Sequence, residues 1–359
     1  MDLVLITDPG SVDPDDILTL FLLTQLNINI KAVVATHHYP TIRAKVTKLI
    51  LTKLGRPDIP VYVGNGVEYS EIFDKNLRNK FLSENEKFPN LFGLPAGVHL
   101  ENEYGWFPNF MKPYYKYFSK EIDEMKIETN YPEFINNLLS DYNPKNKLTI
   151  VCIAPMHDLL CIDEKLYPNM DLYAMGGGFF KSGGKNLVIE KIGYNWGICP
   201  GTTNQVLQIL DRQKVQMTLI SSGFVRNHKI NLPLNIYHKW INMANSGHLQ
   251  IPPITKAFFE DWLNCNEGNL LTSHKNLCDP ITLLLAVTKE FKFLTVQTTI
   301  NMQYLPEFED YLSIVKDKQM IEMHSDNYGN TKLVYDINEN LVCEMIKMIE
   351  MVLFPNICI

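Results

Sequence analysis

The sequence predicts an α/β protein built on an open, mostly parallel, Rossmann-like sheet with helices on both faces. The chain starts with a short apolar run at 3–6, continues with helical periodicity over 14–26, and reaches a second apolar run at 30–35. A helix pattern over 41–54 and a strand pattern at 59–63 follow. Continuous apolar runs of this length are typical of strands buried on both faces. Their alternation with helices over short connections predicts parallel strand pairing.

Later parts of the chain extend this pattern after one interruption. Residues 66–128 are polar, aromatic and rich in Gly and Pro, which predicts an insertion rather than a second domain. Further strands are predicted at 148–153, 172–175 and 215–220, a helix near 132–141, and a strand followed by an amphipathic helix over 332–353. Residues 233–275 have the helical and loop-rich pattern of a lid. Because no internal repeat or linker divides the chain, residues 1–359 are expected to form one domain.

The composition favours a small-molecule ligand. The 359 residues are 46% hydrophobic and 20% charged, which suits a globular protein with a substantial core. The formal net charge is -7, and no long run of Lys or Arg stands out. Nucleic-acid binding needs a basic face, so we expect no nucleic-acid partner. The basic positions from Arg43 to Lys53 recur at helical spacing and are expected to form a solvated helix face.

Cysteine usage and apolar segments indicate the cellular setting. The seven cysteines are an odd number without a C-x-x-C pair, which argues against a disulfide framework and a structural zinc site. No segment approaches the roughly 20 apolar residues that cross a membrane. The apolar run at 3–6 is interrupted at once by Asp8, unlike a signal peptide. These features predict a cytoplasmic protein without a membrane partner.

Four aspartates stand where the first predicted strand leads into the first helix. Asp8 follows the strand directly, at the end of a strand where open α/β sheets bind ligands. Asp13 suits a helix N-cap, and acidic residues in the first turn complement the helix dipole, so capping can explain Asp13 and one of Asp15 and Asp16. Capping does not explain Asp8. Several carboxylates brought together raise one another's pKa values, and a hard cation such as Ca²⁺ or Mg²⁺ relieves that repulsion.

Short motifs along the chain resemble those of the inosine–uridine nucleoside hydrolase family. Residues 7–10 followed by Asp15 and Asp16 resemble the family's opening D-P-G-x-D-D signature, with three extra residues before the aspartate pair. Further motifs follow in the family's order at 54–64 (helix–strand continuation), 153–159 (G-P-L-T-N), 175–178 (M-G-G-G), 194–196 (E-F-N), 278–280 (H-D-P) and 332–353 (closing strand and helix). Their common order across most of the chain makes the resemblance specific. It implies the nucleoside hydrolase fold and a homodimer or homotetramer.

The resemblance also implies a Ca²⁺ site and a ribose site. The implied calcium ligands are Asp8, Asp16, Asp279 and the backbone carbonyl of Ile153. Asp8 would also orient or deprotonate the attacking water. Asp15 would bind ribose hydroxyls together with Met175 and Asn195. Cleavage of an N-ribosyl bond passes through an oxocarbenium-like sugar, so water activation and nearby carboxylates both suit this chemistry.

The ribose half of the implied site departs from the family pattern. Gly193 stands where the family's E-F-N motif has glutamate, which removes a ribose-binding carboxylate. Glu190 or Asn186 could substitute for it. The family's Gly-Asn after the second strand is replaced by Thr36, His37 and His38. His37 could contact the ribose or the base, or the histidine pair could belong to a surface loop.

The leaving-group half departs as well. Cys278 replaces the histidine of H-D-P, and a thiol donates a proton poorly unless its pKa is tuned. His99 lies where the family often has a histidine and is a second candidate for activating the leaving base. We therefore expect a hydrolase that cleaves the N-glycosidic bond of a ribonucleoside to give ribose and free base, with water activated by Ca²⁺ and Asp8. The alternatives are a cation- and ribosyl-binding module without catalysis and a hydrolase of another ribosyl compound, with a pocket reshaped by residues 66–128.

Overall fold

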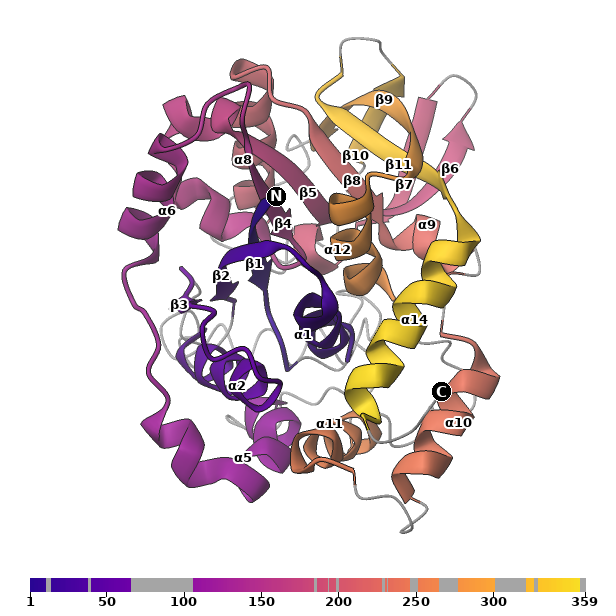
Figure 1. Cartoon of the computed structure of the whole chain (residues 1–359). Helices are drawn as coiled ribbons and strands as arrows, with labels where there is room; N and C mark the ends of the chain where they lie inside the picture. Colours follow the sequence, from indigo (N-terminus) through magenta and orange to yellow (C-terminus); the bar gives the residue numbers. More distant parts are fainter. Residues whose placement is uncertain are drawn as a thin grey trace, which may run out of the picture.

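A central sheet organises the protein. The computed structural model describes residues 1–10, 14–37, 40–65, 106–183, 186–192, 194–197, 200–227, 230, 232–245, 251–264, 277–300, 321–325 and 329–355. Within these ranges eleven strands form one sheet in the order β3-β2-β1-β4-β5-β8-β11-β9-β10-β7-β6 (Figure 1). The strands are β1 Asp2–Thr7, β2 Asn29–Ala35, β3 Val61–Val63, β4 Leu148–Cys152, β5 Met170–Gly176, β6 Gly178–Gly183, β7 Asn186–Ile192, β8 Met217–Ser221, β9 Phe291–Ile300, β10 Ile321–Ser325 and β11 Thr331–Ile337.

The sheet has a parallel part and an antiparallel part. The pairs from β3 to β11 in this order are all parallel. The pairs from β11 through β9, β10 and β7 to β6 are antiparallel. The predicted open, mostly parallel sheet is therefore confirmed, and every strand predicted from an apolar run lies in its parallel part.

Helices cover both faces of the sheet. They are α1 Asp15–Gln25, α2 Pro40–Lys53, α5 Trp106–Glu124, α6 Tyr131–Ser140, α7 Tyr194–Gly197, α8 Pro200–Arg212, α9 Ser222–Asn227, α10 Leu234–Asn245, α11 Pro253–Asn264, α12 Cys278–Thr288 and α14 Glu339–Leu353, with the 3₁₀ helices η1 Met156–Cys161 and η2 Glu164–Asn169. Leu3 and Leu5 of β1 join a core with α1, α2, α12 and α14, whereas Val4 and Ile6 join a core with α6 and α8. Alternate residues of one apolar strand thus supply two cores, as its pattern predicted.

The antiparallel strands and several helices were not predicted. In β9, Phe293 is 42% exposed and Leu294 is 47% exposed, whereas Thr298 is buried. Val296 of the same strand is buried, so burial along β9 does not follow apolar character from residue to residue, and its pattern gave no strand prediction. No helix in the described ranges combines the length and apolar character that a membrane span requires.

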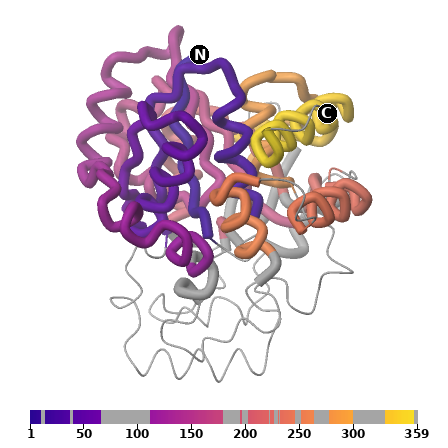
Figure 2. The backbone as a smooth tube through the Cα atoms, turned by 60° about the horizontal axis from the view of Figure 1, so that its bottom comes forward, coloured from indigo at the N-terminus to yellow at the C-terminus, as the bar shows by residue number. Residues whose placement is uncertain are grey.

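Two regions predicted as additions to the sheet contain helices. Helix α5 falls within 66–128, and residues 66–105 of that stretch lie outside the described residues. Helices α10 and α11 fall within 233–275. Although far apart in the sequence, α5 and α11 pack side by side (Figures 1 and 2). The roles of these regions as an insertion and a lid stay predictions.

Candidate metal centre

The candidate site lies where the strand order reverses. The chain proceeds from β1 to β2 on one side and later to β4 on the other, so β1 lies between them. Thr7 pairs with Ala35, and Ile6 pairs with Cys152, so the three strands end at the same edge. Open α/β sheets bind ligands in the crevice formed at such a switch point. Asp8 follows the first of these strands directly.

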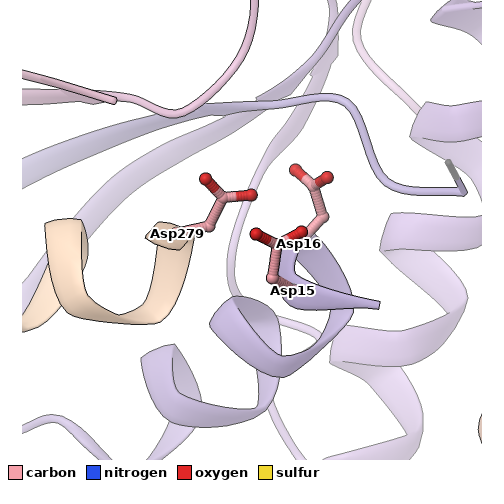
Figure 3. A group of neighbouring side chains, drawn as sticks. All are labelled: Asp15, Asp16 and Asp279. Carbon is pink, nitrogen blue, oxygen red and sulfur yellow. The ribbon is translucent and has the colours of Figure 1, made fainter. Parts of the chain in front are cut away.

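Three carboxylates meet at this edge. Asp15 and Asp16 occupy the first turn of α1, and Asp279 occupies the first turn of α12. One side-chain oxygen of each lies within 4.8 Å of the others, and Figure 3 shows the three side chains converging from the two helices. All three residues are at most 5% exposed. Two packed helices thus present their N-termini, which favour negative charge, to one point.

Asp8 lies beside this group and is tied to it through the backbone. Its N–H donates to Asp16 Oδ1 over 3.0 Å, and the Thr7 hydroxyl donates to the same oxygen. The residues grouped by the 4.8 Å distance therefore differ from the implied ligand set in one member, because Asp15 is included and Asp8 is not. Asp15 lies on the same helix as Asp16, and its carboxylate is close enough to Asp279 on α12 to raise the pKa of that residue.

Burial and mutual repulsion make this site costly without a positive charge. Burial, followed by the neighbouring Asp15 and Asp16 carboxylates, raises the pKa of Asp279 well above its usual value. Burial and Asp16 likewise raise the pKa of Asp8, against the opposing effect of Arg43. Among the described residues, Asp279 Oδ1 is buried without a hydrogen-bond partner. A buried oxygen of this kind, in a group of hard carboxylate donors, fits a divalent cation such as Ca²⁺.

Asn195 connects the ends of β4 and β5 at this edge. It is 5% exposed, and its Nδ2 donates to the Ile153 carbonyl over 2.8 Å. The same nitrogen lies 3.5 Å from the Met175 carbonyl and 3.7 Å from its sulfur. The structure thus brings these three predicted site residues together. A carbonyl oxygen has two lone pairs, so the Ile153 carbonyl can still coordinate a cation.

The remaining predicted site residues have different surroundings. His37 is 3% exposed, so the interpretation of this histidine as part of a surface loop is wrong. Cys278 is buried at the start of α12, next to Asp279. Asn186 begins β7, where its backbone pairs with His324 in the antiparallel part of the sheet. His99, Gly193 and His38 lie outside the described residues.

A second polar cluster crosses the end of β1 and was not predicted. The Thr36 hydroxyl donates to Asp158 and lies 3.1 Å from His157 Nε2, whose ring stacks on His37 at 5.9 Å between centroids. Burial lowers the pKa of His157 although Asp158 attracts a proton to it. Burial also raises the pKa of Asp158, so the 3.8 Å contact between these two side chains is a poor ion pair. A Cβ added at Gly64 would lie 2.7 Å from Thr36 Cβ, so only glycine fits beside this cluster.

Arg43 is the other residue that was missed. It lies in the first turn of α2 and is 1% exposed, so the expected solvated helix face is wrong for this residue. The sequence carried a usable signal, because position 43 shares its helical stripe with Thr47 and Ile50, which are also buried. An arginine on the buried stripe of a helix needs partners inside the protein.

These features define an α/β protein with a buried acidic cluster at the sheet's switch point. The chain belongs to the inosine-uridine preferring nucleoside hydrolase family, whose model matches residues 3–343. The resemblance carried by its motifs is thereby confirmed. No curated protein sequence matches the chain.

Solved structures share the fold at low sequence identity. The inosine-uridine preferring nucleoside hydrolase from Bacillus anthracis is 15% identical with a TM-score of 0.59, over 98% of this chain and 99% of that one. The purine-preferring ribonucleoside hydrolase from Gardnerella vaginalis is 14% identical with a TM-score of 0.59, over 99% and 100%. The type III effector XopQ, complexed with adenosine diphosphate ribose, is 16% identical with a TM-score of 0.59, over 98% and 94%. These similarities show the nucleoside hydrolase fold.

Proposed function

We propose that this protein is a Ca²⁺-dependent hydrolase that cleaves the N-glycosidic bond of a ribonucleoside to give ribose and the free base. Family membership supports N-ribosyl hydrolase activity. The observation that supports a bound cation is the buried group of Asp15, Asp16 and Asp279, in which one Asp279 oxygen has no hydrogen-bond partner among the described residues. Such a group is stabilised by a divalent cation and is poorly explained by helix capping alone.

The proposed ligands are Asp8, Asp16, Asp279 and the Ile153 carbonyl. Asp16 Oδ1 already accepts the Asp8 N–H, which fixes this carboxylate relative to the turn after β1. Asp279 presents an oxygen without a protein partner in the described ranges. A bound Ca²⁺ would supply positive charge that holds the ribose diol and acidifies a nearby water molecule.

Asp8 serves as the proposed base. In the reaction a water oxygen bonds to the ribose C1′ while the C1′–N bond breaks, and the base leaves with the bonding electron pair and takes up a proton. Asp8 accepts the proton that the water loses. The carboxylates around the site stabilise the positive charge that develops on the sugar, and Asp15 binds ribose hydroxyls.

Asn195 and Met175 form the other wall of the proposed ribose site. The bond from Asn195 to the Ile153 carbonyl fixes the amide orientation, so its oxygen faces away from that carbonyl. An amide held in this way can position a sugar hydroxyl without a large ordering cost. We propose Cys278 or His99 as the residue that protonates the leaving base.

A second candidate is a hydrolase or a binding module for another ribosyl compound. One structure with this fold, the XopQ effector, was solved with adenosine diphosphate ribose. The absence of the family's glutamate at Gly193 and histidine at Cys278 favours such a change of ligand or a loss of catalysis.

Release of reducing sugar tests the proposal. The protein would be incubated with inosine, uridine, adenosine, guanosine, cytidine and adenosine diphosphate ribose, with Ca²⁺ or with a chelator. We expect turnover of at least one nucleoside that the chelator and Asp8→Asn each reduce at least about a hundredfold. Asp211→Asn, a matched change on the exposed part of α8, should retain activity. Binding without turnover of any compound would contradict the hydrolase and support the binding module.

A further inference from the structure

Arg43 lies inside the candidate site although it is not a member of the acidic group. It sits in the first turn of α2 with 1% of its surface exposed. The end of β2 pairs with Thr7, and α2 begins soon after that strand, so the topology brings this turn beside Asp8. A guanidinium is almost never buried to this extent unless its donors are paired.

The guanidinium holds the turn that carries Asp8. Arg43 Nη1 donates to the backbone carbonyls of both Asp8 and Pro9. The next residue, Gly10, has a φ of 95°, so the turn uses a left-handed conformation that favours glycine. The Asp8 N–H donates to the Asp16 carboxylate, so Asp8 is held at its N–H as well as at its carbonyl. The backbone of Asp8 is thus fixed both by Asp16, a candidate metal ligand on α1, and by the Arg43 guanidinium on α2.

Arg43 could affect metal binding through its charge or through its hydrogen bonds, and these two roles predict opposite effects on the affinity for the metal. A buried positive charge beside the Asp8 carboxylate repels a divalent cation, so removal of the charge should tighten Ca²⁺ binding if charge is all that matters. A guanidinium that holds the ligand-bearing turn in place reduces the ordering that a metal must impose, so its removal should weaken binding. The two bonds from one nitrogen to consecutive carbonyls favour the second role, because they act on backbone geometry.

We propose that Arg43 is a positioning residue that holds the Asp8–Pro9–Gly10 turn in the geometry that binds the cation. This gain in affinity outweighs the repulsion between the guanidinium and the cation. This inference rests on the proposed function only in taking Ca²⁺ as the ligand. It assigns to α2 a part in the site that the acidic residues alone do not suggest.

Calcium affinity, measured by isothermal titration calorimetry on the full chain, tests this role without depending on turnover. Arg43→Met removes the charge and both bonds but retains an unbranched apolar stem. Arg43→Lys retains the charge and loses the planar guanidinium. The matched control is Lys45→Met, which removes a positive charge from the same helix, where Lys45 Nζ is bonded to the Asp123 carbonyl over 3.1 Å.

We expect Arg43→Met to raise the Kd for Ca²⁺ at least about tenfold, Arg43→Lys to raise it several-fold, and Lys45→Met to leave it unchanged. Unchanged or tighter Ca²⁺ binding in either Arg43 variant would overturn the positioning role. If Arg43→Met does not fold by circular dichroism, Arg43→Lys decides the question.

The outcome is separable from that of the proposed function. Weakened Ca²⁺ binding without nucleoside turnover in the unaltered protein would retain the role of Arg43 and contradict the hydrolase. Nucleoside turnover by the unaltered protein, together with a Ca²⁺ affinity that neither Arg43 variant changes, would support the hydrolase and contradict the role of Arg43. Failure of the unaltered protein to bind Ca²⁺ would overturn the role of Arg43 together with the cation of the proposed function.

Discussion

At the scale of single residues, Asp279 shows how a candidate metal ligand can oppose stability. Its carboxyl is buried among other carboxylates, and one of its oxygens lacks a hydrogen-bond partner in the described structure. Burial and its acidic neighbours raise its pKa, so the ionised form destabilises the metal-free fold at neutral pH. A bound cation would reverse this effect.

Asp279→Asn should therefore change stability in opposite directions with and without the metal. Without Ca²⁺ we expect the Tm to rise by a few degrees, because one of the repelling charges is gone. For the unaltered protein, Ca²⁺ at a hundred times its Kd should stabilise the fold by about 2.7 kcal/mol, and the variant should lose most of that gain. Thermal melts with Ca²⁺ and with a chelator measure both effects.

The matched control for this prediction is Asp211→Asn on α8, which removes an exposed carboxylate. It should leave both the metal-free Tm and the Ca²⁺-induced shift unchanged. An equal Ca²⁺-induced shift in Asp279→Asn and in the unaltered protein would remove Asp279 from the metal site.

At the scale of secondary-structure elements, α11 carries an acidic residue on its buried face. Asp261 is 6% exposed, its Oδ1 has no hydrogen-bond partner within the described ranges, and burial alone raises its pKa well above the usual value. A group whose folded-state pKa is raised binds a proton more tightly in the folded state. Its contribution therefore becomes unfavourable as the pH rises above the unfolded-state pKa of about 3.9.

Asp261→Asn should stabilise the protein by roughly 1–3 kcal/mol at pH 7 and much less at pH 4, where the carboxyl is protonated in the folded state. Urea denaturation at the two pH values measures the difference. The neighbouring Glu260→Gln gives the control, because Glu260 accepts from Lys116 Nζ over 2.8 Å and from the Tyr117 hydroxyl. That change should be neutral or mildly destabilising. A destabilised Asp261→Asn at pH 7 would show that this carboxyl has a partner worth more than its burial costs.

A second element-scale feature connects α10 to the C-terminal helix α14. Glu350 accepts from the fully buried Trp240 indole over 2.7 Å and from Lys239 over 2.9 Å. Glu350→Leu would leave the indole N–H without an acceptor and should lower stability by about 1–3 kcal/mol. Glu350→Gln retains an acceptor for Trp240 and should cost less, as should Lys239→Met, since Lys239 is 43% exposed. Urea midpoints should follow this order, and equal losses in the leucine and glutamine variants would contradict it.

At the scale of the whole molecule, the parallel part of the sheet was predictable and the antiparallel part was not. Strand β1 contains the continuous apolar run 3–6, and β4 is apolar except for Thr149, because both faces of these strands are covered. This pattern is visible without knowing any partner strand. Strand β9 exposes Phe293 and Leu294 and buries Thr298, so its sequence lacks the corresponding signal. The position of such a strand depends on its neighbours β10 and β11.

The candidate site likewise has one part that the sequence predicted and another that it did not. The sequence by itself determined that Asp8 follows a buried strand and that Asp15 and Asp16 lie in the first turn of a helix, because strand ends and helix starts depend on local sequence patterns. Asp279 was expected in the site only because it matches a motif of the family. Only the tertiary structure decided that Asp15 joins Asp16 and Asp279, that His37 stacks on His157, and that Arg43 is buried against the Asp8 turn. Each of these contacts joins elements that are distant in the chain, and the packing of those elements fixes distances that no local spacing encodes.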